Sequence, residues 1–396
     1  MTRWLRQTAA VMWLNMRTIP ARFSASAVAI IGIAGVVVVF VSVLSIAAGF
    51  SAAMQGSGSP GRALVLRSGS DTEMTSGLDA AAVDVIKQAP GIRRDGSPLA
   101  SAELYLIIDL PKKATPDASA NVPLRGIEPA GMAAREEVSL VQGRMLEFGT
   151  DEVIVGRGAN GQFITTSVGD TIVSGQNRWR VVGVFEADGG VAESEIWADA
   201  RSLQGAYRRG NTYQSVLAQL ESAAAFDAFR DWLTSNPQLN VMIRRENEYY
   251  AGQSQALTRL IQSIGFAIAG LMGIGAVFGA ILTMYTAVAT RAREIATLRA
   301  LGFSTSSVLF SVLAESLVLG AIGGLIGAVG AYLAFNGYQT STMNFQTFTQ
   351  VAFAFRVTPQ LLAMGLFYAL TLGLLGGLLP AIRAARLPIA SALREL

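Results

Sequence analysis

Few residues in this 396-residue sequence could carry out covalent or acid–base chemistry. The sequence contains no cysteine and no histidine, which excludes thiol and imidazole nucleophiles, Cys/His zinc sites and disulfides. Its three lysines, Lys87, Lys112 and Lys113, do not lie in a GxxxxGK[ST] loop, so we expect no ATP-binding P-loop here. We therefore predict that the chain is not an enzyme, has no catalytic or metal-binding residue, and binds no cofactor itself.

One acidic residue, Glu315, lies within a predicted membrane-spanning stretch. A charge deep in a bilayer costs at least a few kcal/mol, so such a residue needs a reason to be there. Glu315 lies one to two turns from the predicted cytoplasmic end of its helix, within reach of an arginine such as Arg299. We favour a structural ion pair over a substrate-binding or proton-binding role.

One segment is predicted to contain a charged helix, its C-terminal end and the N-terminus of the next helix. It runs from Thr290 to Ser316 and reads TRAREIATLRALGFSTSSVLFSVLAES. Gly302 is a helix-ending residue, and Ser304 to Ser307 offer N-caps for the next helix. Ile295, Leu298 and Leu301 form a compact apolar set on a short amphipathic helix. A bare surface loop would not need this pattern, which favours insertion into a groove of a partner protein.

Glycine pairs spaced four residues apart recur in the apolar stretches. In lipid, small residues allow helix backbones to approach closely and so supply the packing. We interpret these pairs as helix-packing positions within the chain, with a dimer interface or a sliding surface as the alternative. The pairs are Gly275/Gly279, Gly320/Gly324, Gly323/Gly327 and Gly373/Gly377.

The composition indicates a membrane protein. Hydrophobic residues make up 51% of the chain and charged residues only 15%, against roughly 25% charged in a soluble domain. Four long stretches are almost free of charge, and each can form a helix of the roughly 20 residues that cross a bilayer. We predict four transmembrane helices at 23–50, 258–290, 308–335 and 359–382.

Arginines flanking these helices predict their orientation. Basic residues concentrate before the first helix (1–22), between the second and third (291–307) and in the tail (383–396). By the positive-inside rule, these three segments and both termini are cytoplasmic. Segment 51–257 and the short loop 336–358 are then extracytoplasmic. Segment 1–22 suits an interfacial amphipathic helix or a simple extension of the first helix. The first apolar run is too long for a usual cleaved signal peptide.

The segment 51–257 is long enough to be an independent domain. Between Arg62 and Arg259 there are 20 basic and 25 acidic residues. Neither this excess of acidic residues nor the net charge of +3 of the whole chain favours binding to nucleic acid. Alternating runs predict strands at 63–68, 103–110, 151–156, 178–186, 213–220 and 240–246, and helices at 76–89 and 222–236. The segment from Glu246 to Arg259 continues into the second transmembrane helix without a break. The predicted fold is a four-helix membrane protein with a large α+β domain inserted between helices 1 and 2.

These motifs together resemble one known family. TRAREIATLRALGFS and LPAIRAARLPIASALREL resemble the cytoplasmic coupling segment and C-terminal end of MacB/FtsX-type ABC transporter permeases. The first helix is similar to theirs, and RGIEP, DEVIVGRGA and RWRVVGVFEADGG are similar to strands of their periplasmic domain. The order of one helix, a large outer domain and three further helices is also that of the family.

The resemblance implies a permease subunit that works as a dimer, a homodimer being favoured, with a separate ABC ATPase dimer that binds ATP and Mg²⁺. Only 26 residues precede the first apolar core, whereas MacB carries its ATPase upstream of this helix, so we expect the ATPase on another chain. Further implied partners are membrane lipid and, in some systems, a periplasmic adaptor protein. The implied location is the bacterial plasma (inner) membrane. The implied ATPase-coupling residues are Arg293, Glu294, Ile295, Leu298, Arg299, Ala300, Leu301 and Gly302.

Family members act as mechanotransmitters, and export or efflux is the function that we favour for this chain. The alternative is an FtsX-like regulator that activates an extracytoplasmic enzyme without transport, although the outer domain of such regulators is usually smaller. A membrane-embedded enzyme would need several polar residues converging within the helices, and only Glu315 qualifies. The sequence does not identify a substrate.

Overall fold

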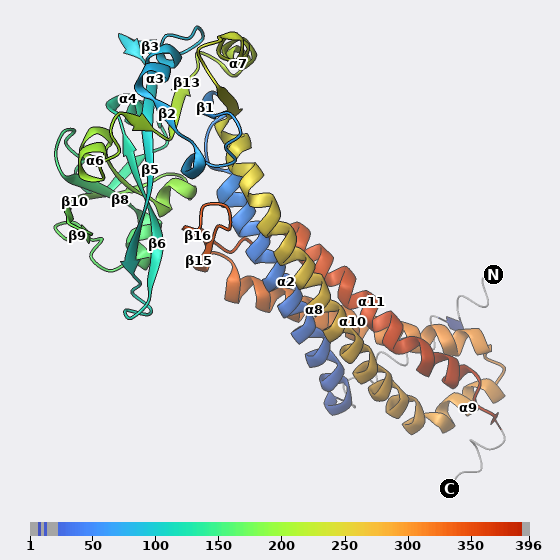
Figure 1. Ribbon diagram of the computed structural model, residues 1–396. Helices are drawn as coiled ribbons and strands as arrows, with labels where there is room; N and C mark the ends of the chain where they lie inside the picture. Colours follow the sequence, from blue (N-terminus) through green and yellow to red (C-terminus); the bar gives the residue numbers. More distant parts are fainter. Residues whose placement is uncertain (1–6, 9–11, 14–22, 390–396) are drawn as a thin grey trace. The chain divides into compact units, whose positions relative to one another are not determined.

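The computed structural model describes residues 7–8, 12–13 and 23–389 and divides into two compact units (Figure 1). The helical unit contains residues 1–48, 259–338 and 355–396, and the sheet unit contains residues 49–258 and 339–354. The helix proposed for residues 1–22 lies largely outside the described residues. The units correspond to the predicted membrane part and inserted α+β domain, except at residues 339–354.

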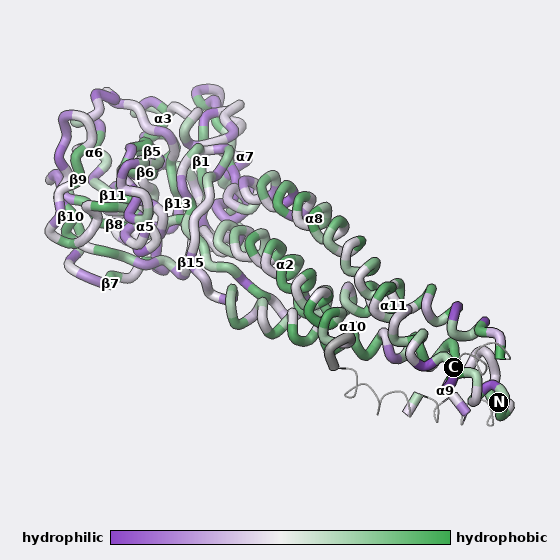
Figure 2. The backbone as a smooth tube through the Cα atoms, turned by 90° about the horizontal axis from the view of Figure 1, so that it is seen from below, coloured by the Kyte–Doolittle hydropathy of each residue, from purple (hydrophilic) through white to green (hydrophobic). Residues whose placement is uncertain are grey.

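The described part of the chain has four helices that are long and apolar enough to cross a membrane. They are α2 (Phe23–Gln55), α8 (Glu246–Thr290), α10 (Thr305–Phe335) and α11 (Pro359–Ala385). Hydrophobic residues predominate along these helices, as the hydropathy colouring of the backbone shows (Figure 2). In lipid this suits the helical state, because a helix satisfies its own backbone hydrogen bonds.

Helix α8 confirms the expected continuity, because it is one helix of 45 residues. At 1.5 Å per residue it is about 68 Å long. Its first turns, from Glu246, belong to the sheet unit, and the rest, from Arg259, belongs to the helical unit.

The sheet unit is built on a mixed ten-stranded sheet in the order β14-β1-β13-β5-β6-β11-β8-β10-β7, with β9 paired to β10. Strands β6 and β11 are parallel, as are β8 and β10, and the other pairs are antiparallel. The strands are β1 (Arg62–Arg67), β5 (Ala100–Pro111), β6 (Ser119–Ile127), β7 (Ser139–Gly143), β8 (Glu152–Gly156), β9 (Thr171–Ser174), β10 (Asn177–Glu186), β11 (Ile196–Asp199), β13 (Ser215–Gln219) and β14 (Val241–Arg245).

Shorter elements connect these strands. Two-residue strands form the pairs β2 (Leu78–Asp79) with β12 (Thr212–Tyr213) and β3 (Arg94–Asp95) with β4 (Ser97–Pro98). The helices are α3 (Ala80–Lys87), α4 (Pro129–Ala133), α5 (Arg157–Gln162), α6 (Ala200–Ala206) and α7 (Phe226–Ser235), and 3-10 turns lie at Glu73–Thr75, Val191–Ser194 and Ala223–Ala225.

All six predicted strands and both predicted helices of this unit are present. Two central strands were not predicted. Strand β6 contains Pro123, and β11 has only four residues, so neither shows a clear period-2 pattern.

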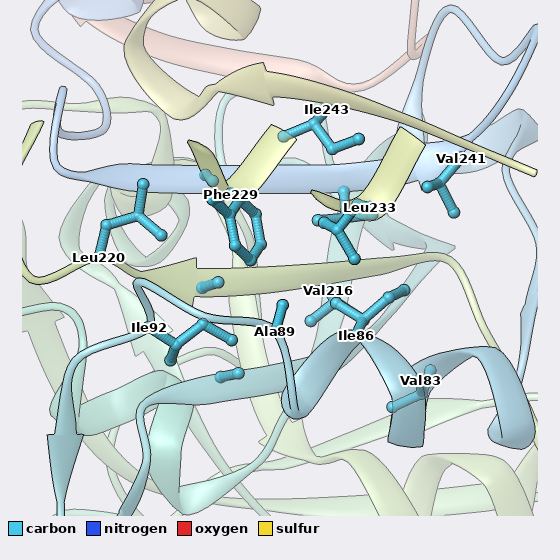
Figure 3. Close-up of a cluster of buried hydrophobic side chains, with 14 of the residues drawn as sticks. Val83, Ile86, Ala89, Ile92, Val216, Leu220, Phe229, Leu233, Val241 and Ile243 are labelled. Atoms are coloured by element: carbon cyan, nitrogen blue, oxygen red, sulfur yellow. The ribbon is translucent and has the colours of Figure 1, made fainter. Parts of the chain in front are cut away.

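One hydrophobic core lies between α3, α7 and the sheet (Figure 3). Phe229 and Leu233 of α7 and Ile86 of α3 are fully buried there. Phe226, Phe229 and Leu233 recur at helical spacing, which explains why α7 packs with this face inward. A second core around Trp179 and Phe163 lies among β5, β6, β8, β10 and α6.

The segment between α10 and α11, expected as a short loop, contains a hairpin of β15 (Gln339–Met343) and β16 (Gln350–Ala354). This hairpin belongs to the sheet unit. The Ala352 N–H donates to Ser194 Oγ at 2.8 Å, and Asn344 Nδ2 donates to Gln253 Oε1 at 2.9 Å. The sheet unit is therefore joined covalently to α10 and α11 as well as to α2 and α8.

A substitution at Gly158 of α5 tests the docking of this hairpin. A Cβ at Gly158 would lie 2.7 Å from Ala352 Cβ, whereas a Cβ at Gly161, in the same helix, has no neighbour within 4 Å. We expect Gly158→Val to speed hydrogen–deuterium exchange in residues 339–354 and to destabilise the protein by about 1–3 kcal/mol. Gly161→Val should leave hairpin exchange at the wild-type rate, and equal effects of the two variants would contradict the packing.

Candidate functional site

A short helix, α9 (Ala292–Ala300), connects α8 to α10 and carries most of the predicted coupling residues. Arg291 separates α8 from α9 with φ −111° and ψ 12°, so the chain changes direction there. At the other end, Gly302 has φ +89°, a conformation that favours glycine. The N–H of Gly302 donates to the carbonyl of Arg299 and that of Phe303 to the carbonyl of Leu298, both at 3.1 Å. This is a Schellman cap, and it ends α9 where the sequence predicted.

The next helix starts immediately. Ser304 is the N-cap of α10, and its Oγ accepts the N–H of Ser307 at 3.2 Å. Helix α9 is thus a separate element with defined ends, because both ends have their own hydrogen-bonded caps or turns.

A buried ion pair lies at the joint between α8 and α9. Arg291 Nη1 donates to Glu315 Oε2 of α10 at 3.0 Å, and both side chains are 6% exposed. Glu315 is therefore paired with an arginine, as favoured, but the partner is Arg291. Arg299 instead donates from Nη1 to the carbonyl of Leu387. The pair is surrounded by apolar side chains of α8 and α10, including Val288, Val308 and Val312.

The faces of α9 differ from the sequence interpretation. Ile295 and Ala296 are buried within the helical unit, Leu298 is half-buried against the Arg291–Glu315 pair, and Leu301 is 72% exposed. Ile295, Leu298 and Leu301 therefore do not form one outward apolar face. Ile295 fixes α9 to α8 and α10, and the outward surface contains Arg293, Glu294, Thr297, Ala300, Leu301 and Gly302.

Three of the glycine pairs lie in close contacts between helices. A Cβ at Gly320 would lie 2.9 Å from the carbonyl of Ala369, and one at Gly373 would lie 2.8 Å from that of Ser316. Gly324 and Gly377 similarly face α11 and α10, while Gly323 and Gly327 contact α2. Gly275 and Gly279 have no such neighbour within 4 Å among the described residues. Packing between the described helices therefore does not explain this last pair.

The sheet unit contains a second concentration of charge that sequence reasoning did not find. Arg125 is 1% exposed and donates all five of its N–H bonds to Glu73, Glu103 and Glu195, at 2.7 to 3.0 Å. Arg135 donates to both carboxylate oxygens of Glu103. These residues are far apart in the sequence and show no spacing pattern. Only the sheet brings them together.

Residues 26–236 match the model of the MacB-like periplasmic core domain, and residues 266–389 match that of the FtsX-like permease C-terminal region. The chain belongs to the MacB/FtsX family of ABC transporter permeases. In this permease the two matched regions correspond to the first helix with most of the sheet unit, and to most of the helical unit.

Individual relatives match part of the chain. The permease is 30% identical over 154 residues (37% of this chain) to the uncharacterized ABC transporter permease YvrN of Bacillus subtilis (strain 168). It is 28% identical over 244 residues (58% of this chain) to the macrolide export ATP-binding/permease protein MacB 1/2 of Paracoccus denitrificans (strain Pd 1222). The matches cover 36% and 34% of these two relatives.

A solved structure, the periplasmic region of MacB from Actinobacillus actinomycetemcomitans, is also similar. It has a TM-score of 0.37 and 14% identity, and the match covers 49% of this chain and 93% of that chain.

The buried network predicts how stability depends on pH. Burial by itself raises the pKa of Glu103, but the guanidinium groups of Arg135 and Arg125 outweigh burial and hold this pKa below its usual range. The network therefore contributes fully above the ordinary glutamate pKa of about 4.3, and its contribution is lost as pH falls through the lower folded-state pKa. We expect the melting temperature of the sheet unit to decrease as the pH is lowered below about 4.

Glu103→Gln should destabilise the sheet unit by about 3–5 kcal/mol at pH 7, because it breaks a buried ion pair. It should also weaken the dependence on acid pH. The matched control is Glu136→Gln, whose carboxylate pairs with Arg93 at an exposed site and should contribute less than about 1 kcal/mol. Thermal melts by tryptophan fluorescence from pH 3 to pH 7 measure both variants. Equal stability of the two variants would show that the network contributes little.

Proposed function

We propose that this chain is the permease subunit of an ABC transporter and transmits ATP-driven motion of a separate ATPase to its extracytoplasmic sheet unit, thereby driving export. The observation that carries the proposal is the arrangement at α9. This helix has defined ends, exposes a mixed polar surface with Leu301, and is attached to α8 and α10 through Ile295 and the Arg291–Glu315 pair. A force on the exposed surface would therefore act on both long helices.

Two covalent routes lead from α9 to the sheet unit. Helix α8 continues without a break to Glu246 in that unit. Helix α10 packs closely on α11 through glycines, and the connection between them is the β15–β16 hairpin of the sheet unit. A rigid helix transmits displacement along its axis, so motion of the joint at Arg291 would reach the sheet unit at both places.

The proposed topology and partners follow from charge and family. Arginines near α9 and in the tail favour a cytoplasmic location for these segments and both termini, in a bacterial plasma membrane. An ABC ATPase dimer would bind ATP and Mg²⁺ and contact α9. A second copy of the chain would complete the permease, and the open glycines Gly275 and Gly279 suit close approach of another helix. An adaptor protein is a further proposed partner.

The proposed contact with the ATPase can be tested at Leu301. Leu301→Asp should abolish stimulation of ATP hydrolysis by the reconstituted permease, because a carboxylate replaces an exposed apolar anchor, while the chain still inserts and folds. Leu301→Met, which keeps the apolar character, should retain most of the stimulation. Stimulation by Leu301→Asp at the wild-type level would refute α9 as the ATPase contact.

Transmission through the joint can be separated from ATPase binding. The sequence lacks cysteine, so Asp117→Cys gives one spin label per chain on an exposed turn. In the assembled transporter, an ATP analogue should change the label-to-label distance between the two sheet units. Glu315→Gln should abolish this change while ATPase binding persists, because the Arg291 guanidinium loses its buried charged partner, although the exposed carboxylate of Glu294 stays 3.5 Å from its Nε. Thr297→Ser, on the exposed face of the same joint, is the control. An unchanged distance response in Glu315→Gln would exclude the ion pair as the link.

Export and enzyme regulation would use the same force path. The 210-residue span of the sheet unit from 49 to 258 favours export, because regulators of the FtsX type usually have a smaller outer domain. Co-purification distinguishes them, since a bound extracytoplasmic hydrolase would support the regulator.

A further inference from the structure

The sheet unit encloses a cavity of about 260 Å³ beside its buried ion network. Its walls come from the turn that follows α2 (residues 56–60), the first turn of α8, the loop at residues 187–192, and the buried side chains of Arg125 and Trp197. Pro60 and Asp188 at the edge of the cavity are exposed. The cavity can therefore exchange a small solute with the surroundings.

Negative charge exceeds positive charge around this cavity. Three guanidinium groups line it, those of Arg62, Arg125 and Arg135. Six carboxylates line it or bind these guanidinium groups: Glu73, Glu103, Glu137, Asp188, Glu195 and Glu246. Four of these carboxylates, those of Glu73, Glu103, Glu195 and Glu246, are buried, which is one more than the three buried guanidinium groups. A buried carboxylate in excess is costly unless a cation compensates for it.

The guanidinium groups are already occupied, which argues against an anion as ligand. All five N–H groups of Arg125 already donate hydrogen bonds to carboxylates. Arg62 donates to Glu246, to both oxygens of Glu137 and to the carbonyl of Ala134. An anion would have to compete with these carboxylates for the guanidinium groups. It would also increase the surplus of negative charge.

Two carboxylates that line the cavity, in contrast, each have an oxygen that accepts no hydrogen bond from the described residues. The side chain of Glu246 is 5% exposed, and its Oε2 accepts from Arg62 and from the Ser59 N–H. Its Oε1 accepts no hydrogen bond from the described residues. The carboxylate of Asp188 likewise has no partner among the described residues. Asp188 adopts φ +50° at the cavity edge.

The geometry favours an organic cation over a metal ion. Within the described ranges, no group of three or more acidic side chains is placed to hold a metal, because most carboxylates here are directed to different arginines. Tyr250 lines the cavity, and aromatic faces attract ammonium and guanidinium groups. Trp197, which also lines it, already holds the guanidinium group of Arg135 over its ring, 5.1 Å from the centroid. The volume is below that of a drug-sized pocket, so it suits a compact ligand.

We propose that this cavity binds a small organic cation, with an ammonium or guanidinium group, between Glu246 and Asp188. Such a ligand would neutralise part of the buried negative charge. It would also contact both the turn after α2 and the start of α8. The proposal does not depend on the export function or on the ATPase contact at α9.

Titration of the full-length permease in lipid nanodiscs with L-argininamide tests the site. We expect a saturable rise in melting temperature and a saturable binding isotherm by calorimetry. NaCl and MgCl₂ at matched ionic strength should not reproduce these effects. Glu246→Gln and Asp188→Asn should each weaken argininamide binding at least fivefold. Asp117→Asn, which removes an exposed carboxylate outside the cavity, should leave binding unchanged.

Asp188→Asn keeps the test valid if Glu246→Gln fails to fold, because Asp188 is exposed and Asn also tolerates positive φ. Three results would overturn the proposal. They are the absence of saturable binding, equal stabilisation by MgCl₂, and wild-type affinity in Asp188→Asn.

Discussion

A charged group that is buried away from water needs a partner of opposite charge. This constraint explains how the buried charged residues are arranged in both units of the permease. In the helical unit, Glu315 lies among apolar side chains and is bound by Arg291, the residue that separates α8 from α9. Removing two charged groups from water is costly, and their mutual attraction offsets this cost. If one partner of the pair is removed, the other remains as a buried charge without this compensation. The ion pair therefore fixes the joint at which the coupling helix leaves α8.

The same constraint organises the sheet unit. Arg125 on β6 binds three carboxylates from separate parts of the chain, and Arg62 links the start of β1 to Glu246 at the start of α8. These arginine contacts bring the sheet and the first turn of α8 into one network. The cavity beside this network has more carboxylates than guanidinium groups around it, and the proposed cation follows from that imbalance rather than from any sequence motif.

Close helix packing and charge pairing have complementary roles. Gly320 and Gly373 remove side-chain bulk where α10 and α11 meet, so these helices touch through their backbones. Gly158 performs a similar role where the β15–β16 hairpin lies on α5. Contacts of this kind resist sliding, because a displaced backbone immediately meets another. The hairpin and the unbroken α8 are two of the covalent connections between the sheet unit and the helical unit.

The sequence by itself determined the four apolar helices, the α+β insertion and the ends of α9, because these depend on local composition, period and capping residues such as Gly302 and Ser304. It also indicated that Glu315 needs an arginine. Only the tertiary structure decided that this arginine is Arg291, that Ile295 faces inward while Leu301 faces outward, and that Gly275 and Gly279 meet no neighbour among the residues that the structure describes. The network of Arg125 likewise depends on residues that only folding brings together. Helical spacing shows which residues share a face, but a neighbouring element must be in place before that face is buried or exposed.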